Sequence, residues 1–277
     1  MTTSVAPRED SDSALSTTAP SRGEIRIDRT AKRIRTVLAG EIVADSVRAN
    51  LAYATGRHPE YLLPEQDVDW GTFDVDDATS ESDLIGSHHL LRSRNREGTV
   101  GRRYVDGPAA GLVSFEFDKM DAWFEEEEQI WFHPRDPYRR VEVIESSRSI
   151  EVTVDGRLLA SSERPRLVIE TGLPERWYIP RVDVDWTQLA PSTTSSGCQY
   201  KGEANWWHVE ADGMDRLADV VWGYERPIPE SSKLAGLVAF YAEHAAVETH
   251  IDGVCQPKPQ LDAAALNPSL GLKNLAA

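Results

Sequence analysis

The chain has 277 residues, of which 40% are hydrophobic and 27% charged, a composition typical of soluble globular proteins. Its formal net charge of −16 argues against binding to nucleic acid, because a phosphate backbone needs a cationic surface, and the same charge repels anionic lipid surfaces. The sequence contains no run of about 18 apolar residues, so it predicts no membrane span.

The first 23 residues are rich in Ser, Thr, Ala and Pro and contain no apolar segment of the kind found in secretory signals. We expect a disordered tail at 1–23. The two cysteines, Cys198 and Cys255, are too few for a disulfide framework and lack the Cys-x-x-Cys spacing of many zinc sites. These features favour a cytoplasmic protein, and no motif implies a cofactor or a metal.

An internal repeat organises the chain. Residues 34–70 align without a gap on residues 150–186, and 13 of the 37 aligned pairs are identical. Average composition gives about two or three identities by chance. The same offset of 116 carries Gly86 onto Gly202. After a nine-residue shortening in the first copy, residues 111–115 align with 236–240. The sequence therefore predicts two tandem copies of one domain.

We assign the first repeat to residues 24–132 and the second to residues 141–253, each of a common size for a domain with its own core. The segment 133–140 (HPRDPYRR) joins them, and its two prolines favour an extended connector because they fix φ and remove backbone donors. Residues 254–277 contain three prolines and are expected to form an unstructured C-terminal tail.

Within the second repeat, residues 150–154 alternate between apolar and polar side chains, as in a strand. Asp155-Gly156 is typical of a two-residue hairpin turn, so we expect 157–160 to form the second strand of the hairpin. Similar runs indicate strands at 166–170, 177–179, 204–210, 218–224 and 237–241. Pro180 predicts that the strand before it is short or at an edge. One helical turn is expected at 230–234. We predict a mostly β fold with little helix: two small antiparallel domains, each half-barrel or tent-like.

Three runs of the second repeat carry a resemblance to a known family: CQYKGEANWW at 198–207, WGYERPIP at 222–229 and AGLVAFY at 235–241. Together with the connector, they resemble the bacterial domain of unknown function 427 family, which is also filed under a nucleotidyltransferase-like label. The resemblance covers about residues 33–253 and implies a compact β fold, but no established reaction. The chain lacks the Gly-rich phosphate loop and the paired metal-binding aspartates typical of nucleotidyl transfer.

The first repeat departs from this pattern. At the offset of 116, Ser82, Leu84, Ile85 and Ser87 stand in place of Cys198, Tyr200, Lys201 and Glu203. The counterpart of the run at 222–225 falls in the shortened region. We therefore expect any site in the second repeat, with the first as a structural partner that replaces the second subunit of a homodimer. The expected states are a monomer with a pseudo-two-fold repeat or a homodimer.

The strongest chemical candidate is the run Tyr200-Lys201-Gly202-Glu203. Gly202 permits an unusual backbone angle or a close approach to a ligand. In an extended segment Lys201 and Glu203 project from one face. Lys201 then holds an anionic group and Glu203 moves a proton. The competing interpretation is a surface ion pair across strands, which stabilises little.

Other residues extend this candidate site. A neighbouring lysine lowers a thiol pKa, which makes Cys198 a candidate nucleophile, although free cysteines are more often small buried hydrophobes. Trp207, Trp222 and Tyr224 are candidate pocket walls, with a core of large rings as the alternative. Glu225 precedes Arg226-Pro227, where a restricted backbone can hold a carboxylate at a pocket rim.

Two further clusters are weak metal candidates. His88 and His89 are adjacent and point in opposite directions in a strand, and the acidic run at 125–128 lacks the spaced oxygen ligands of a dedicated site. We predict no metal site.

The sequence leaves three functions open. The first is a protein that binds or transforms a small polar molecule, which can be anionic. If this protein is an enzyme, it uses acid/base chemistry. The second is a non-catalytic protein-interaction module, and the third is a nucleotide-binding or nucleotidyltransferase-like protein. A pocket that gathers Lys201, Glu203 and Tyr224 favours the first, whereas a flat apolar patch favours the second.

Overall fold

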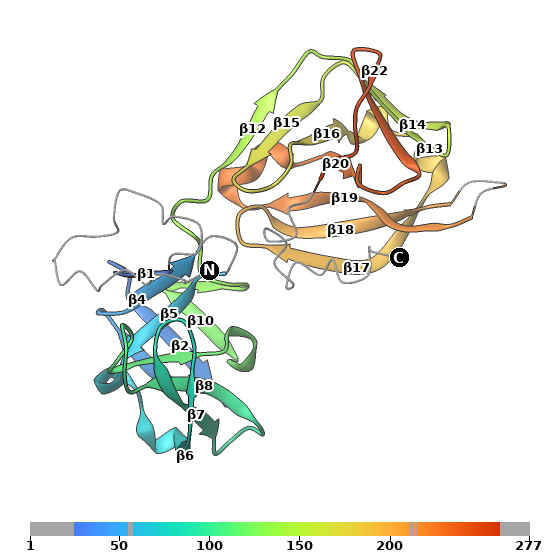
Figure 1. The fold of residues 1–277 in the computed structure, drawn as a ribbon. Helices are drawn as coiled ribbons and strands as arrows, with labels where there is room; N and C mark the ends of the chain where they lie inside the picture. The colour runs from blue at the N-terminus through green and yellow to red at the C-terminus, as the bar shows by residue number, and fades with distance from the viewer. Residues whose placement is uncertain (1–24, 55–57, 211–212, 214, 261–277) are drawn as a thin grey trace. The chain divides into compact units, whose positions relative to one another are not determined.

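The computed structural model describes residues 25–54, 58–210, 213 and 215–260. The chain divides into two compact units, residues 1–137 and 138–277. Each unit contains a seven-stranded sheet, curled as a half-barrel, and a four-stranded sheet, with 3₁₀ turns in place of longer helices (Figure 1). This architecture confirms the predicted mostly β fold. The predicted tail at 1–23 and residues 261–277 lie outside the described residues.

In the first unit the sheet orders are β1-β4-β5-β9-β8-β7-β6 and β11-β10-β2-β3, with every pairing antiparallel. The strands are β1 (Ile25–Arg29), β2 (Ile34–Leu38), β3 (Glu41–Ser46), β4 (Asn50–Ala54), β5 (Glu60–Pro64), β6 (Phe73–Ser82), β7 (Ser87–Ser93), β8 (Thr99–Tyr104), β9 (Leu112–Phe115), β10 (Ala122–Glu125) and β11 (Glu128–Ile130).

The second unit repeats this topology strand for strand, with orders β12-β15-β16-β20-β19-β18-β17 and β22-β21-β13-β14. The strands are β12 (Val141–Glu145), β13 (Ile150–Val154), β14 (Arg157–Ser162), β15 (Arg166–Glu170), β16 (Arg176–Pro180), β17 (Leu189–Cys198), β18 (Gly202–Val209), β19 (Leu217–Pro227), β20 (Leu237–Phe240), β21 (Val247–Ile251) and β22 (Val254–Cys255). The internal repeat read from the sequence is thus a repeat of structure.

One core joins the two sheets of the second unit. Alternate residues of the strands point inward, as period-two patterning dictates. Val152 from the four-stranded sheet belongs to the same buried cluster as Ile179 and Val238 from the seven-stranded sheet. Each such side chain contributes about 1.5–3 kcal/mol when it leaves water.

The predicted elements of the second repeat are largely present. Asp155 and Gly156, with φ of +46° and +76°, form the expected two-residue turn between β13 and β14. The helical turn occurs as a 3₁₀ segment, Pro229–Leu234. The strand β16 is short but is not an edge strand, because it pairs with both β15 and β20. Its proline is tolerated at the last position. The strand β22 lies within the predicted tail at 254–277, so the second unit continues past Gly253.

Residues identical in the two repeats form the same contacts in both units. Ser162 Oγ donates to Asp183 Oδ2 at 2.7 Å, and the Arg164 guanidinium donates to Asp183 Oδ1 at 3.0 Å. The first unit repeats this arrangement with Ser46, Arg48 and Asp67. The shared residues therefore stabilise the common fold.

We expect Asp183→Asn to lower the free energy of unfolding by about 1 kcal/mol at neutral pH, because charge-assisted hydrogen bonds to the carboxylate are lost. The hydrogen bond from Arg164 lowers the pKa of Asp183 against the effect of burial, and Ser162 adds to it. A folded-state pKa below the unfolded value of about 3.9 gives stability that is present above that value and lost as the pH falls. Urea unfolding at neutral pH and at about pH 3 checks this. An equal loss at both pH values contradicts the ionic origin.

Candidate functional site

A tight turn at residues 199–201 joins β17 to β18. Lys201 N donates to the Cys198 carbonyl at 3.2 Å and closes the turn. Gly202 follows with φ of +109°, and a Cβ there lies 3.0 Å from the Arg226 carbonyl oxygen. Both features favour glycine here: the positive φ is the unusual backbone angle that the sequence predicted, and the close approach is to the Arg226 backbone rather than to a ligand. The turn directs Lys201 toward the interior, where the lysine is only 8% exposed.

Lys201 forms a buried ion pair with Glu170, the last residue of β15. Lys201 Nζ donates to Glu170 Oε2, and Arg139 donates to Glu170 Oε1 at 3.1 Å. The Glu170 side chain is 6% exposed and that of Arg139 is 24% exposed. Burial opposes the charge on Lys201, but Glu170 outweighs it and raises the lysine pKa. One carboxylate thus joins two cations in a largely dry environment.

Two phenols and a thiol complete this group. Tyr178 and Tyr224 are 2% and 6% exposed, and burial raises the pKa of both. A hydrogen bond with Cys198 adds to the rise for Tyr224. Cys198 and Tyr178 are also among the neighbours that raise the pKa of Lys201. We call these six residues the Lys201 cluster: Arg139, Glu170, Tyr178, Cys198, Lys201 and Tyr224.

The curl of the sheet assembles the Lys201 cluster. In the sheet order β12-β15-β16-β20-β19-β18-β17, Glu170 belongs to the second strand, β15, and Cys198 to the last, β17 (Figure 1). The turn after β17 reaches back across the half-barrel to place Lys201 on Glu170. The cluster therefore depends on the curl of the sheet rather than on a local motif.

The predicted pairing of Lys201 with Glu203 is wrong. Lys201 lies in a turn rather than in an extended strand, so the two residues do not share a face. Glu203 is exposed on β18, opposite Gly197 and Arg226 in the ladder. The carboxylate beside Lys201 is Glu170 instead.

Of the predicted aromatic walls, Trp222 and Tyr224 contact Tyr178 of the Lys201 cluster. Their ring centroids are 6.3 and 6.5 Å from that of Tyr178, and Trp222 Nε1 donates to the Tyr178 hydroxyl at 3.1 Å. Tyr200 is half-buried, and the Arg139 guanidinium lies over its ring, with Arg139 Cζ 5.5 Å from the Tyr200 ring centroid. Tyr224 is thus a member of the Lys201 cluster, while Trp222 and Tyr200 contact its members Tyr178 and Arg139. Trp222 and Tyr224 are also part of the core.

Trp207 and Glu225 belong to a separate group. Trp207 packs against Trp186 with centroids 5.4 Å apart, and the Arg181 guanidinium lies 5.0 Å from the Trp207 ring. Arg181 also donates to the exposed Glu225 at 3.1 Å. The structure therefore gathers Cys198, Lys201 and Tyr224, but not Glu203, Trp207 or Glu225.

Sequence reasoning missed Glu170, Arg139 and Tyr178. The signal for Glu170 was present, because Val168 and Glu170 share the inner face of an alternating strand. A carboxylate on a buried face requires a partner. That partner lies 31 residues away in sequence, and nothing in the local pattern identifies it.

In the first unit, apolar or small residues occupy most of these positions: Ala54 for Glu170, Leu62 for Tyr178, Ser82 for Cys198 and Ile85 for Lys201. Tyr224 is an exception. The register of β8 on β9 equals that of β19 on β20 and places Tyr104 at the position of Tyr224. The sequence alignment put this counterpart in the shortened region, and for the tyrosine that was wrong. Tyr104 is fully buried and donates to Asp83 Oδ2 at 2.9 Å.

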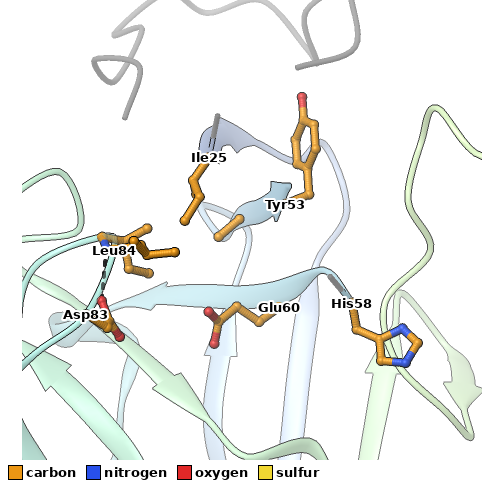
Figure 2. A pocket seen from close by; sticks show the side chains of 8 residues that line it. Ile25, Tyr53, His58, Glu60, Asp83 and Leu84 are labelled. Carbon is orange, nitrogen blue, oxygen red and sulfur yellow. Dashed lines mark hydrogen bonds between the residues drawn. The ribbon is translucent and has the colours of Figure 1, made fainter. Parts of the chain in front are cut away.

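An open pocket lies beside Asp83, the hydrogen-bond partner of Tyr104, in the first unit. Its lining residues are Ile25, Ala52, Tyr53, His58, Glu60, Asp83, Leu84 and Ile85. In Figure 2, Glu60 and Asp83 lie along one side, with Ile25 and Tyr53 across from them. Of its lining residues, Ile85 stands at the position of Lys201 and Leu84 at that of Tyr200, so the pocket borders the first unit's counterpart of the cluster.

A family model described as domain of unknown function (DUF427) matches residues 26–126 and 142–253. The chain belongs to the DUF427 family. The two DUF427 matches fall one in each structural unit, which confirms the resemblance and the tandem arrangement. No curated protein matches the chain. Among the residues described, no helix is long and apolar enough to cross a membrane.

Proposed function

We propose that the second DUF427 repeat binds a small molecule that carries an anionic group, and that the Lys201 cluster is its site. Two cations, Lys201 and Arg139, face a single carboxylate, Glu170. The surplus positive charge lies at Arg139, which is partly exposed at the edge of the buried pair and so can be reached by an anion. Near such a protein interior the attraction is stronger than in bulk water.

The observation that carries this proposal is that the first repeat builds the same fold without these charges. Its strand order is identical, yet Ala54 and Ile85 stand at the positions of Glu170 and Lys201. Buried ion pairs lose much hydration and often stabilise a protein no more than apolar residues of similar volume. Because the fold does not require the pair, a functional role accounts for it better than a structural one.

Arg139 and Tyr200 mark the side from which a ligand enters, because both are partly exposed. The planar guanidinium of Arg139 suits a carboxylate or phosphate, which it binds through two parallel hydrogen bonds. Beyond it, Lys201 lies among the Cys198 thiol and two phenols. If the repeat is an enzyme, these groups hold and move a proton, with Glu170 in the role that the sequence assigned to Glu203.

A thermal-shift screen of carboxylates, sugar phosphates, nucleotides and acyl compounds tests the proposal. A ligand at 100 times its Kd adds about 2.7 kcal/mol of stability to the wild type. The matched control is the double variant Glu170→Leu, Lys201→Met, which removes both charges and keeps the volume. We expect hits with the wild type that disappear in the control. Hits that persist in the double variant place the ligand elsewhere, and no hit across the panel contradicts the proposal.

A further inference from the structure

Three side chains with different donor atoms converge on the four-stranded sheet of the second unit, a different sheet from the one that carries the Lys201 cluster. They are Glu248 and His250 on β21 and Cys255 on β22. One carboxylate oxygen, one ring nitrogen and the thiol sulfur all lie within 4.8 Å of one another. Oxygen, nitrogen and sulfur donors thus meet at one place.

The hairpin geometry fixes this convergence. Asp252 and Gly253, with φ of +51° and +78°, form a two-residue turn that sets His250 opposite Cys255. Gln256 N donates to the Thr249 carbonyl, so Thr249 and Gln256 form a hydrogen-bonded pair. Because such pairs alternate, His250 and Cys255 form a non-hydrogen-bonded pair, in which facing side chains are closest. Glu248 lies two residues before His250 and therefore projects from the same face.

Polar atoms at this place lack partners. His250 Nδ1 is buried and has no hydrogen-bond partner among the described residues, and the same holds for the hydroxyl of Thr153, opposite Glu248 in the ladder. Cys255 Sγ makes one long contact, 3.8 Å to the Gln256 carbonyl oxygen. Buried nitrogens in folded proteins are normally satisfied, so an unpaired imidazole nitrogen points to an additional ligand.

We propose that Glu248, His250 and Cys255 bind a zinc ion, with water at the fourth position. Thiolate and imidazole are ligands that zinc prefers and accepts together with a carboxylate, whereas calcium and magnesium select oxygen alone. Tetrahedral bonds of about 2.0–2.3 Å place ligand atoms roughly 3.3–3.8 Å apart, so the three side chains need only small adjustments. Glu151, opposite His250 on β13, adds negative charge to this face.

The first repeat has no counterpart of the site. The registers of β10 on β2 and of β21 on β13 match Glu248, His250 and Cys255 with Ala122, Phe124 and Gln129. Both repeats build this hairpin, so the fold does not require the three donors. The first repeat also supplies a natural replacement for testing, His250→Phe.

Thiol alkylation with and without zinc tests the proposal on the full chain under reducing conditions. Zinc should slow the alkylation of Cys255 by roughly tenfold or more, because a bound thiolate is no longer a free nucleophile. Cys198 in the same molecule is the internal control, and its rate should not change. Mass spectrometry of the digested protein follows both thiols at once.

Two variants separate a built site from incidental zinc binding by a thiol. His250→Phe and Glu248→Gln each keep Cys255 and should lose most of the zinc protection, while circular dichroism confirms folding. Cobalt should give a sulfur-to-metal charge-transfer band in Cys198→Ser and none in Cys255→Ser. The proposal is overturned if Cys255 reacts equally fast with and without zinc, or if protection persists in both the His250 and the Glu248 variants.

Discussion

Lys201→Met alone should lower the free energy of unfolding of the second repeat by about 3 kcal/mol, the low end of the range for breaking a buried ion pair. The change leaves the Glu170 carboxylate, 6% exposed, without its nearest cation. Arg139 still donates to the other carboxylate oxygen, and this remaining contact keeps the loss from being larger.

The double variant Lys201→Met, Glu170→Leu should instead lie within about 1 kcal/mol of the wild type, because a buried pair replaced by apolar residues of similar volume is often neutral or stabilising. Arg139 loses its partner but is partly exposed and can turn toward water. The first repeat, with Ile85 at the position of Lys201, already folds around an apolar side chain there.

Urea unfolding of the wild type, both single variants and the double variant measures the coupling between the two residues. A double variant that is several kcal/mol less stable than the wild type means that Lys201 and Glu170 support the fold. In that case the main support for a functional site is gone. Recovery of stability in the double variant leaves ligand binding as the reason for the charges.

The sequence predicted most of the fold because the repeat can be read by aligning the chain on itself and the period-two alternation is a local signal. The hairpin at 150–160 illustrates this, since Asp155-Gly156 alone specifies its turn. The site was predicted less well. Lys201 and Gly202 were identified from their run, but the premise of a regular strand through Lys201 assigned it the wrong carboxylate. Its true partner, Glu170, is brought close by the curl of a seven-stranded sheet, which alternation does not encode.

The β21–β22 hairpin shows the same limit. We expected no metal site, because Cys255 has no second cysteine at a ligand spacing along the chain. In the ladder His250 is its direct neighbour, and the turn residues Asp252-Gly253 were the signal for that pairing. Because residues from 254 onward were assigned to a tail, Cys255 was not considered as part of a strand that pairs with His250. Spacing along the chain finds sites built on loops more readily than sites built across strands.

Arg176→Leu should lower the free energy of unfolding by about 3–5 kcal/mol, the largest single effect that we predict. The Arg176 guanidinium donates to both oxygens of Glu243, at 2.9 and 2.5 Å, and the two side chains are 16% and 9% exposed. It also lies 5.2 Å from the Trp222 ring centroid. Its loss leaves a buried carboxylate without a cation and removes a cation–π contact.

The matched control is Arg148→Leu, because Arg148 pairs with Asp252 at 2.7 Å but both side chains are about half exposed. A surface pair of this kind is screened by water and contributes little, so the control should unfold nearly like the wild type. Comparing the two variants by urea unfolding isolates burial as the cause, since the substitution is the same. Equal losses in both variants contradict it. A small loss for Arg176→Leu means that water reaches Glu243, and the surroundings of Trp222 are then wetter than the structure indicates.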